Sequence, residues 1–410
     1  AGVQLPHENG RETEESLAEL ARLADTAGAL VAGTVVQRLR RPDPATLLGR
    51  GKVRDEIALA CRELGVELVI CDRELSPAQV RNLEEELDVR VIDRTQLILD
   101  IFARRARTRE GKLQVELAQL EYLYPRLTGK GTDLSRLGGG IGTRGPGETK
   151  LETDRRRIRR RIADLRRELE EVRRHRTLLR TRRQDVPVTL AALVGYTNAG
   201  KSTLLNALTG ADVFAGDRLF ATLDPTTRRL VLPGGEEVLL TDTVGFIRRL
   251  PHHLVAAFRA TLEEVTEADL LLHVVDAGHP GYPAQVGAVE SVLSSLGAAE
   301  KPTILVYNKI DRLTAGEALS LPEGRLSVAV SALTGQGLDR LRQLMAQVLK
   351  EGKVRGEFLV PHHRGDVLHL LYEKGEVLSR QDTPEGVRLE VELGKVWAAR
   401  AAGRLKGERA

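Results

Sequence analysis

The sequence predicts a multidomain α/β protein, and three observations support that fold class. Its 410 residues exceed what one ordinary hydrophobic core organises, so about two to four domains are expected. Apolar strand-like runs alternate with helical patterns near the start of the chain, which is typical of a small parallel α/β domain. Further on, an apolar run leads directly into a glycine loop and another helical pattern, which indicates a second α/β domain.

These patterns divide the chain into four expected parts. A small parallel α/β domain occupies residues 1–110, and an antiparallel helical hairpin occupies 111–187. The hairpin forms an arm with a glycine-rich tip loop at 128–150. The second α/β domain follows at 188–350, and a strand, helix, strand pattern at 351–410 predicts a small α+β domain.

Composition places the chain among reduced, globular proteins. The formal net charge is only +4, but 14 arginines lie between Arg155 and Arg183. The two cysteines, Cys61 and Cys71, have neither metal-ligand spacing nor a disulfide framework. No apolar run reaches the roughly 18 to 20 residues of a membrane helix, so we expect a soluble, cytoplasmic protein.

The first 110 residues alternate between helix and strand patterns. Helices are expected at 15–27, 53–64 and 77–87, and strands at 29–39, 66–71 and 89–92. Ser76 and Pro77 predict a helix N-cap followed by proline at the first helical position. The glycine-containing GRGK at 49–52 lacks a preceding strand, which favours a turn and helix start over a second nucleotide site.

Two helices of the arm are predicted by apolar residues spaced alternately three and four apart, the seam of a coiled coil. The first seam is Leu113, Leu117, Leu120, Tyr124 and Leu127, and the second is Ile158, Ile162, Leu165, Leu169 and Val172. The second helix, about 30 residues long, would reach roughly 45 Å. Its arginines form either a solvated face with internal ion pairs or a phosphate-binding surface, and the sequence leaves both open.

The tip loop combines many glycines with basic side chains, and a loop of this length is normally functional or disordered. One alternative is a flexible linker. The other is close approach to a nucleic-acid backbone, for which the candidate residues are Lys130, Arg136, Arg144, Lys150, Arg155 and Arg156.

A phosphate-binding loop is predicted between Gly195 and Ser202, which read GYTNAGKS. The apolar run 188–194 precedes it and a helical pattern follows from Thr203. Glycines allow backbone N–H groups to curl around phosphate oxygens, and the helix N-terminus adds a partial positive charge. Lys201 would reach the β- and γ-phosphates, and the Ser202 hydroxyl would bind Mg²⁺.

Two further motifs predict that the nucleotide is GTP. Residues 242–245 read DTVG, so Asp242 would hold Mg²⁺ through water and the Gly245 N–H would sense the γ-phosphate. Residues 308–311 read NKID, in which the aspartate carboxylate would accept two hydrogen bonds from guanine and so select GTP over ATP. A Ras-like P-loop GTPase domain is therefore expected at 188–350.

A fourth motif completes the expected base site and the set of contacts. The backbone N–H groups of Ser331 and Ala332 would meet the guanine O6. The residues expected to contact nucleotide are Gly195, Tyr196, Thr197, Asn198, Ala199, Gly200, Lys201, Ser202, Thr203, Phe220, Ala221, Thr222, Leu223, Asp224, Asp242, Thr243, Val244, Gly245, Asn308, Lys309, Asp311, Ser331, Ala332 and Leu333. Of these, Lys201, Thr222 and Gly245 are the candidates for catalysis, and Ser202, Thr222 and Asp242 are the candidates for Mg²⁺.

The residues that activate hydrolysis are less clearly specified. Thr222 is the first candidate for the switch residue that coordinates Mg²⁺ when GTP is bound, with Thr226 and Thr227 as alternatives. Phe246 follows DTVG, where Ras-like enzymes place the glutamine that orients the attacking water. Phenylalanine cannot orient water, so we expect weak intrinsic hydrolysis that a partner, another switch residue or a cation completes.

The chain resembles the HflX family of GTPases, which is related to the Obg group and belongs to the TRAFAC P-loop GTPases. The stretches that carry the resemblance are GYTNAGKSTLLNALTG, FATLDPTTR, LTDTVGFIRRLP, NKID and SAL, together with SRLGGGIGTRGPGETKLETDRRRI and LLGRGKVRDEI upstream. They span most of residues 47–335, and the closing region resembles a small C-terminal domain of some members. In several GTPases with this kind of loop an asparagine at the position of Asn198 helps to hold K⁺; the alternative is a loop-shaping asparagine.

The resemblance implies a ribosome-associated GTPase whose N-terminal domain and arm bind the large ribosomal subunit near the peptidyl-transferase centre. In its GTP state such a protein would split stalled or idle ribosomes, acting as a monomer on rRNA. Two alternatives stay open: an Obg-like GTPase of ribosome assembly, and a nucleotide-dependent RNA-binding or remodelling protein. Family members have also been described as hydrolysing ATP, which NKID does not favour.

Overall fold

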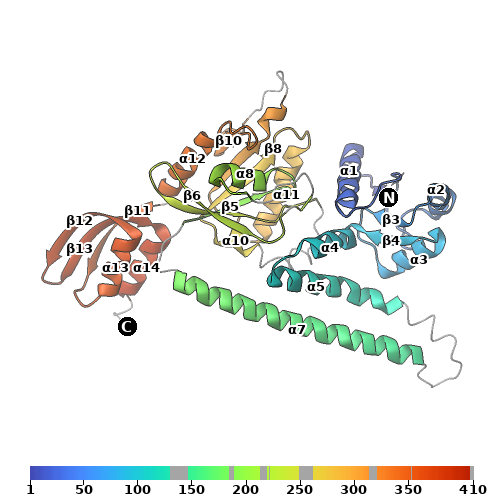
Figure 1. The fold of residues 1–410 in the computed structure, drawn as a ribbon, viewed down its shortest axis with the longest axis horizontal. Helices are drawn as coiled ribbons and strands as arrows, with labels where there is room; N and C mark the ends of the chain where they lie inside the picture. Colours follow the sequence, from blue (N-terminus) through green and yellow to red (C-terminus); the bar gives the residue numbers. More distant parts are fainter. Residues whose placement is uncertain are drawn as a thin grey trace. The chain divides into compact units, whose positions relative to one another are not determined.

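The computed structural model describes residues 1–129, 146–183, 189–212, 219–220, 222–248, 262–313, 321–351 and 353–406 (Figure 1). Their contacts divide the chain into two compact units. Unit 1 comprises Ala1–Arg174, Phe214–Asp224 and Val244–Leu262, and unit 2 comprises His175–Val213, Pro225–Thr243 and Glu263–Ala410. Two short segments from within 188–350 are therefore counted with unit 1.

Unit 1 begins with a small α/β fold, as predicted. Its strands pair in parallel, β1 (Gly2–Gln4) with β2 (Val36–Arg38) and β3 (Leu68–Cys71) with β4 (Arg90–Asp93). Its helices are α1 (Gly10–Thr26), α2 (Ala58–Glu63), α3 (Pro77–Leu87) and α4 (Arg94–Arg105), with a π-helical segment Lys52–Ile57 before α2. Buried side chains such as Val53, Leu75 and Leu83 close the core between the strands and helices.

The ends of these elements follow local sequence signals where such signals exist. The Ser76 hydroxyl accepts a hydrogen bond from the Gln79 N–H at 3.2 Å, and Pro77 opens α3, as predicted. The helix expected at 15–27 begins earlier, at Gly10, because Asn9 forms a capping box. The strand expected at 29–39 was too long, since only Val36–Arg38 pairs with another strand.

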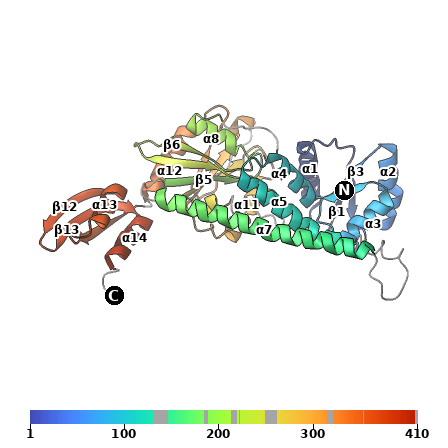
Figure 2. The same ribbon diagram turned by 60° about the horizontal axis from the view of Figure 1, so that its bottom comes forward.

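The arm's two helices are α5 (Arg109–Leu123) and α7 (Pro146–Arg183), and Figures 1 and 2 both show α7 running alongside α5. Leu165 of α7 is fully buried against Leu113 and Leu117 of α5, as the predicted seam requires. The tip loop, predicted at 128–150, overlaps helical residues at both of its ends. A 3₁₀ helix occupies Tyr124–Gly129, and α7 already begins at Pro146, where proline's missing N–H costs no helical hydrogen bond.

Unit 2 contains a six-stranded sheet in the order β10-β9-β8-β5-β7-β6, parallel except for the antiparallel edge pair β6 and β7. The strands are β5 (Thr189–Gly195), β6 (Thr226–Val231), β7 (Glu237–Asp242), β8 (Leu270–Asp276), β9 (Thr303–Asn308) and β10 (Ser327–Ala329). The helices are α8 (Lys201–Thr209), α10 (Glu263–Glu267), α11 (Tyr282–Ser295) and α12 (Leu338–Glu351).

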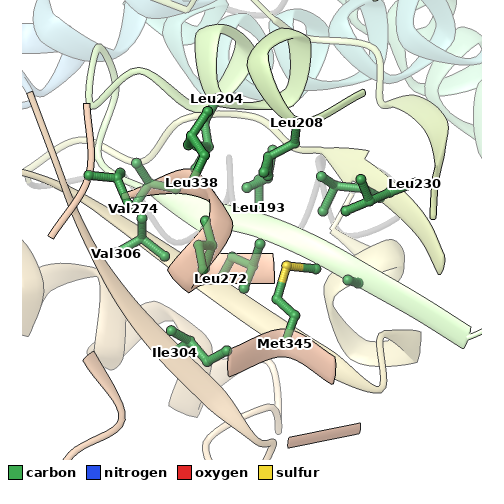
Figure 3. Packing of buried hydrophobic residues seen from close by; sticks show 14 of the residues in the cluster. Leu193, Leu204, Leu208, Leu230, Leu272, Val274, Ile304, Val306, Leu338 and Met345 are labelled. Carbon is green, nitrogen blue, oxygen red and sulfur yellow. The ribbon is translucent and has the colours of Figure 1, made fainter. Parts of the chain in front are cut away.

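Two hydrophobic layers hold this sheet. Leu204 and Leu208 of α8 and Met345 of α12 pack on one face against Leu193 and Leu272 (Figure 3). A smaller cluster around Val275 and Tyr307 packs against α11 on the other. Because β8 is buried on both faces, it reads as a nearly continuous apolar run in the sequence, interrupted by the buried His273.

The last part of unit 2 is a three-stranded antiparallel sheet in the order β11-β13-β12. Its elements are β11 (Lys353–Val360), α13 (Gly365–Lys374), β12 (Gly375–Thr383), β13 (Gly386–Gly394) and α14 (Lys395–Lys406). The predicted strand, helix, strand pattern omitted a second hairpin strand and α14, although the α+β class was right. In the described part of the chain, no helix combines the length and apolar character needed to cross a membrane.

Candidate nucleotide-binding site

The loop between β5 and α8 has the backbone shape of a phosphate-binding loop. Gly195 and Gly200 adopt positive φ angles of 150° and 92°, which side chains rarely tolerate. A Cβ on Gly200 would lie 2.3 Å from Asn308 Nδ2, and one on Gly195 would lie 2.2 Å from the Val274 carbonyl oxygen. Both positions therefore require glycine, which allows the loop to turn tightly before α8 begins at Lys201.

Lys201 is held inside this loop. Its ammonium group donates to the carbonyl oxygens of Gly195 at 3.2 Å and Tyr196 at 3.0 Å, and the residue is only 7% exposed. The pKa of Lys201 is lowered to about 8, chiefly by burial. The charge of Lys309 also lowers this pKa, whereas the Asp242 carboxylate raises it. A phosphate group here would supply the negative charge that a buried ammonium requires.

Ser202 and Asp242 come together from α8 and the end of β7. The Ser202 hydroxyl donates to Asp242 Oδ2 at 2.6 Å, and Asp242 is fully buried. The next residue, Thr243, donates its hydroxyl to the Leu193 carbonyl at 2.6 Å, which ties the end of β7 to β5. Hydroxyl and carboxylate oxygens are ligands that Mg²⁺ favours, so this pair fits the predicted metal position.

The NKID segment braces the same loop from β9. Asn308 Nδ2 donates to the Ala199 carbonyl at 3.0 Å, and Lys309 Nζ donates to the Asn198 carbonyl at 2.7 Å. Lys309 adopts a positive φ of 65°, a conformation that costs energy for a side-chain-bearing residue. Two consecutive side chains therefore fix two consecutive carbonyls of the phosphate-binding loop.

The base-recognition residues meet at the ends of β9 and β10. The Ser331 hydroxyl donates to Asp311 Oδ1 at 2.5 Å and so orients a carboxylate on an exposed residue. The Ser331 and Ala332 N–H groups, expected to meet guanine O6, instead donate to the Gln336 carbonyl and to Asn308 Oδ1 in this structure. A sequence motif predicts which residues lie at the base site. It does not predict which backbone N–H groups already donate to other protein atoms, because that depends on how the loop folds.

The observed residues fit a guanine nucleotide with Mg²⁺. The glycine cradle and the first turn of α8 offer backbone N–H groups, and Lys201 brings a buried positive charge. Ser202 and Asp242 provide oxygens beside that loop, and Asp311 has a carboxylate oriented by a hydroxyl. Among the described residues, no group of three or more His, Cys, Asp or Glu side chains could hold a metal.

The candidates at 220–224 and 244–246 lie in unit 1. Phe220 and Leu223 are 2% and 3% exposed, and Thr222 is half-buried. Phe220 packs edge-on against Phe102 of α4 with ring centroids 4.6 Å apart. The Asp224 carboxylate accepts hydrogen bonds from the N–H groups of Arg107 at 2.9 Å and Thr108 at 3.0 Å. Ala221 lies outside the described residues.

The segment after Gly245 is anchored by apolar and charged side chains. Val244 is 7% exposed, and Phe246 and Ile247 are both 2% exposed. Arg248 forms an ion pair with Glu15 of α1 at 2.8 Å. Phe246, which follows DTVG, is thus a buried apolar anchor of this segment.

The basic candidates fall on α7 or outside the described residues. Lys130, Arg136 and Arg144 lie outside them, and Lys150 lies in the first turns of α7. Arg155 is half-buried, whereas Arg156 is exposed and pairs with Glu152 at 3.8 Å.

Three other exposed arginines of α7 were missed as individual candidates. These are Arg157, Arg159 and Arg160, which make no ion pair with any residue that the structure describes. Other exposed arginines of the helix, such as Arg161 and Arg166, pair with Glu116 and Glu121 of α5. The exposed arginines of α7 therefore fall into two groups, those that pair with acids and those that make no ion pair among the described residues.

Asp276 was also missed, although it contacts Lys309 at 2.7 Å. It is the last residue of β8, and carboxyl ends of parallel strands line the site edge in α/β folds. The apolar run that ends in Asp276 could therefore have indicated this residue as a candidate for the site.

Family models match almost the whole chain. They are described as GTP-binding GTPase N-terminal over residues 14–103, GTP-binding GTPase Middle Region over 105–183, 50S ribosome-binding GTPase over 190–309 and HflX C-terminal domain over 322–408. A crystal structure of a GTP-binding protein from Sulfolobus solfataricus in complex with GDP is 25% identical, with a TM-score of 0.44. That match covers 85% of this chain and 98% of the solved one.

Two relatives that align with most of this chain share one name. GTPase HflX of Caldanaerobacter subterraneus subsp. tengcongensis is 52% identical over 93% of this chain and 88% of its own length. GTPase HflX of Escherichia coli K12 is 48% identical over 88% of this chain and 85% of its own length. With the loop geometry described above, these matches establish GTP binding and GTP hydrolysis. The chain belongs to the HflX family of GTPases.

Proposed function

We propose that this GTPase binds the large ribosomal subunit and, in its GTP state, splits stalled or idle ribosomes. The single observation that carries the RNA part is the set of exposed arginines on α7, Arg157, Arg159 and Arg160, which make no ion pair among the described residues. Residues 1–187 would form the ribosome-binding part, and 188–350 would form the GTPase domain. The protein would act as a monomer.

In the nucleotide site, each residue has a definite proposed role. Lys201 would bind the β- and γ-phosphates, while Ser202 and Thr222 would coordinate Mg²⁺ and Asp242 would hold it through water. The Gly245 N–H would bind the γ-phosphate. When bound, Mg²⁺ neutralises charge that develops on the phosphate oxygens.

Base selection and activation involve other groups. Asp311, oriented by the Ser331 hydroxyl, would accept two hydrogen bonds from guanine. Because Phe246 is buried and has no polar group, intrinsic hydrolysis would be weak until a ribosomal group, another switch residue or a K⁺ ion near Asn198 completes the site.

Phosphate binding by α7 follows from charge balance. An arginine that already pairs with a glutamate must give up that partner to bind phosphate, whereas an unpaired exposed arginine does not. Arginine presents a planar fork of donors that matches phosphate oxygens. Three such side chains within four residues would give strongly salt-dependent RNA binding.

The first test measures GTP turnover with and without purified ribosomes or large subunits, while sedimentation follows splitting. Lys201→Ala provides the inactive control. Strong stimulation and splitting that requires GTP are expected. No stimulation together with no association with the large subunit would refute the ribosome role and leave a GTPase with another partner.

A second test separates RNA contact from a merely charged surface. Arg157, Arg159 and Arg160 are replaced together by glutamine, and the matched control replaces Arg161, Arg166 and Arg167, which are exposed but paired with acids. We expect the first variant to lose at least tenfold in affinity for large subunits and the control to lose much less. Equal losses would argue against direct phosphate contact by the unpaired set.

The arginines of α7 also favour a second candidate, a nucleotide-dependent RNA-binding protein for which hydrolysis is incidental. In that case Lys201→Ala would leave RNA binding largely intact. An Obg-like role in ribosome assembly would instead appear as preference for subunit precursors over assembled ribosomes, which the same sedimentation experiment can measure.

A further inference from the structure

A carboxylate that none of the four nucleotide motifs includes contacts the lysine of NKID. Asp276 is the last residue of β8, and it lies beside Asn308 in the register between β8 and β9. Its Oδ2 atom accepts a hydrogen bond from Lys309 Nζ at 2.7 Å. The two side chains are 18% and 13% exposed, so this pair is screened by water much less than a surface ion pair.

Both oxygens of this carboxylate are used, which fixes its orientation. Asp276 Oδ1 accepts a hydrogen bond from the Gly278 N–H at 3.1 Å. The adjacent Ala277 N–H donates to the Asn308 carbonyl at 2.9 Å, so the backbone around the aspartate is itself tied to the NKID strand.

The same ammonium group holds the phosphate-binding loop. Lys309 Nζ donates to the Asn198 carbonyl at 2.7 Å, so one nitrogen joins Asp276 to the loop. The Lys309 Cε lies 3.8 Å from the position of a Cβ built on Gly200, which places the lysine stem against the glycine turn. Without Asp276, this ammonium would lose a negatively charged partner and keep its hydrogen bond to the Asn198 carbonyl.

We propose that Asp276 is a positioning residue that holds Lys309 across the phosphate-binding loop and thereby slows the release of bound guanine nucleotide. The inference rests on the nucleotide roles given under the proposed function. It does not depend on the ribosome. Because the contact reaches the loop through Lys309 and not through the γ-phosphate position, GDP and GTP should be affected alike.

The charge arrangement supports this role. Lys201 and Lys309 are two cations that act on one loop, and the charge of Lys309 is among the causes that lower the pKa of Lys201, after burial and against the effect of Asp242. A carboxylate bonded to Lys309 offsets part of this repulsion. Asp276→Asn would keep an oxygen acceptor but remove the negative charge, so it tests the charge itself.

The experiment measures the dissociation rates of fluorescent GDP and of a non-hydrolysable GTP analogue for the full chain and for Asp276→Asn. We expect both dissociation rates to rise about tenfold. An effect of this size is typical when a charge-assisted hydrogen bond, or the energetic coupling between two sites, is lost. KM for GTP should rise by a similar factor, whereas kcat should fall by much less. Glu290→Gln is the matched control, because it breaks an ion pair with Arg325 on the exposed surface of the same unit.

A simple stabilising role makes a different prediction. It would lower the melting temperature of the nucleotide-free protein in Asp276→Asn while leaving the dissociation rates as in the Glu290→Gln control, and that result would overturn the proposal. If Asp276→Asn does not fold, Lys309→Met and Asp276→Glu supply the test, because both should speed dissociation if the position of the ammonium matters. Unchanged rates in both would also overturn it.

A double variant tests whether Asp276 changes the rate of nucleotide dissociation through Lys309. In a Lys309→Met background, Asp276→Asn should change the dissociation rates less than twofold, because the lysine through which it acts is gone. A full tenfold effect in that background would refute the mechanism through Lys309. If the unmodified chain binds no guanine nucleotide, the proposed nucleotide roles themselves are wrong; if it binds but the variants match the control, only the role of Asp276 is wrong.

Discussion

The carboxylate of Asp224 caps the first helix of the arm through Thr108. It accepts hydrogen bonds from the Thr108 N–H at 3.0 Å and from the Thr108 hydroxyl, although the two residues are 116 positions apart in sequence. The Thr108 hydroxyl oxygen in turn accepts from the Gly111 N–H at 3.0 Å in the first turn of α5. The start of this helix is thus held by a residue only two positions beyond Thr222, the candidate Mg²⁺ ligand.

We predict that Asp224→Asn will loosen the N-terminus of α5. The amide keeps one oxygen acceptor but removes a negative charge from a helix N-terminus, which should cost about 1–2 kcal/mol of local stability. Amide hydrogen exchange in the first two turns of α5 should speed up correspondingly. Asp269→Asn is the control, since Asp269 accepts from the Leu190 N–H at 2.9 Å in unit 2. Equal exchange of α5 in both variants would show that Asp224 does not stabilise the helix.

Local patterns predicted the fold class, because the residues that specify each element lie close together in sequence. Ser76 and Gln79 cap α3 across three positions, and the heptad spacing around Leu165 marks the buried side of α7. The contacts of Asp224 and Asp276 were not predictable in this way. Both depend on partners brought together only by the folded chain, and a lone aspartate after an apolar run has many possible roles.

The phosphate-binding loop shows the same limit within one motif. Motif spacing predicted Lys201 as a phosphate ligand and Ser202 and Asp242 as Mg²⁺ ligands, and the structure brings Lys201 beside Gly195 and Ser202 beside Asp242. It did not predict that the Ala332 N–H donates to Asn308, because hydrogen-bond competition inside a loop leaves no sequence pattern. Motif spacing therefore indicates which side chains come together better than which of their atoms are available for a ligand.

We predict that GDP binding weakens as pH rises above about 8. The pKa of Lys201 in the nucleotide-free protein is lowered to about 8, chiefly by burial, so the ammonium is mostly protonated at pH 7 and mostly neutral at pH 9. Phosphate binding favours the charged form, so a proton must then be taken up, and affinity should fall by up to about tenfold per pH unit between pH 8 and 10. Titration calorimetry in buffers of different ionisation enthalpy would measure the uptake directly.

Guanosine is the control for this pH dependence. It carries the same base, with the same ionisation, but no phosphate to interact with Lys201. The affinity for guanosine should therefore not show the fall with rising pH that deprotonation of Lys201 causes for GDP. A GDP affinity that follows guanosine at every pH would contradict the assignment of the titrating group to Lys201.

We predict that Gly200→Ala will abolish measurable nucleotide binding. The new Cβ would lie 2.3 Å from Asn308 Nδ2, so the hydrogen bond from Asn308 to the Ala199 carbonyl must break. The alanine would also strain the backbone, because the φ angle here is positive. Gly210→Ala separates the two effects. Gly210 also has a positive φ, of 68°, but a Cβ there meets nothing within 4 Å. That control should lose roughly 1–2 kcal/mol of stability and keep its nucleotide affinity, whereas equal binding losses would assign the effect to backbone strain alone.

We predict that Leu165→Ala will destabilise the arm without impairing intrinsic GTP hydrolysis. Leu165 is completely buried between α5 and α7, so truncation removes its contacts and leaves a cavity that helices held by few other apolar residues cannot readily fill. The expected cost is about 2–5 kcal/mol, against less than about 1 kcal/mol for Leu123→Ala, whose side chain is 42% exposed in α5. Limited proteolysis should cleave α7 faster in the first variant alone, while turnover without ribosomes stays near that of the unmodified protein. Proteolysis at the same rate in both variants would mean that the ion pairs of Arg161 and Arg166 with α5, rather than the leucine seam, hold the hairpin together.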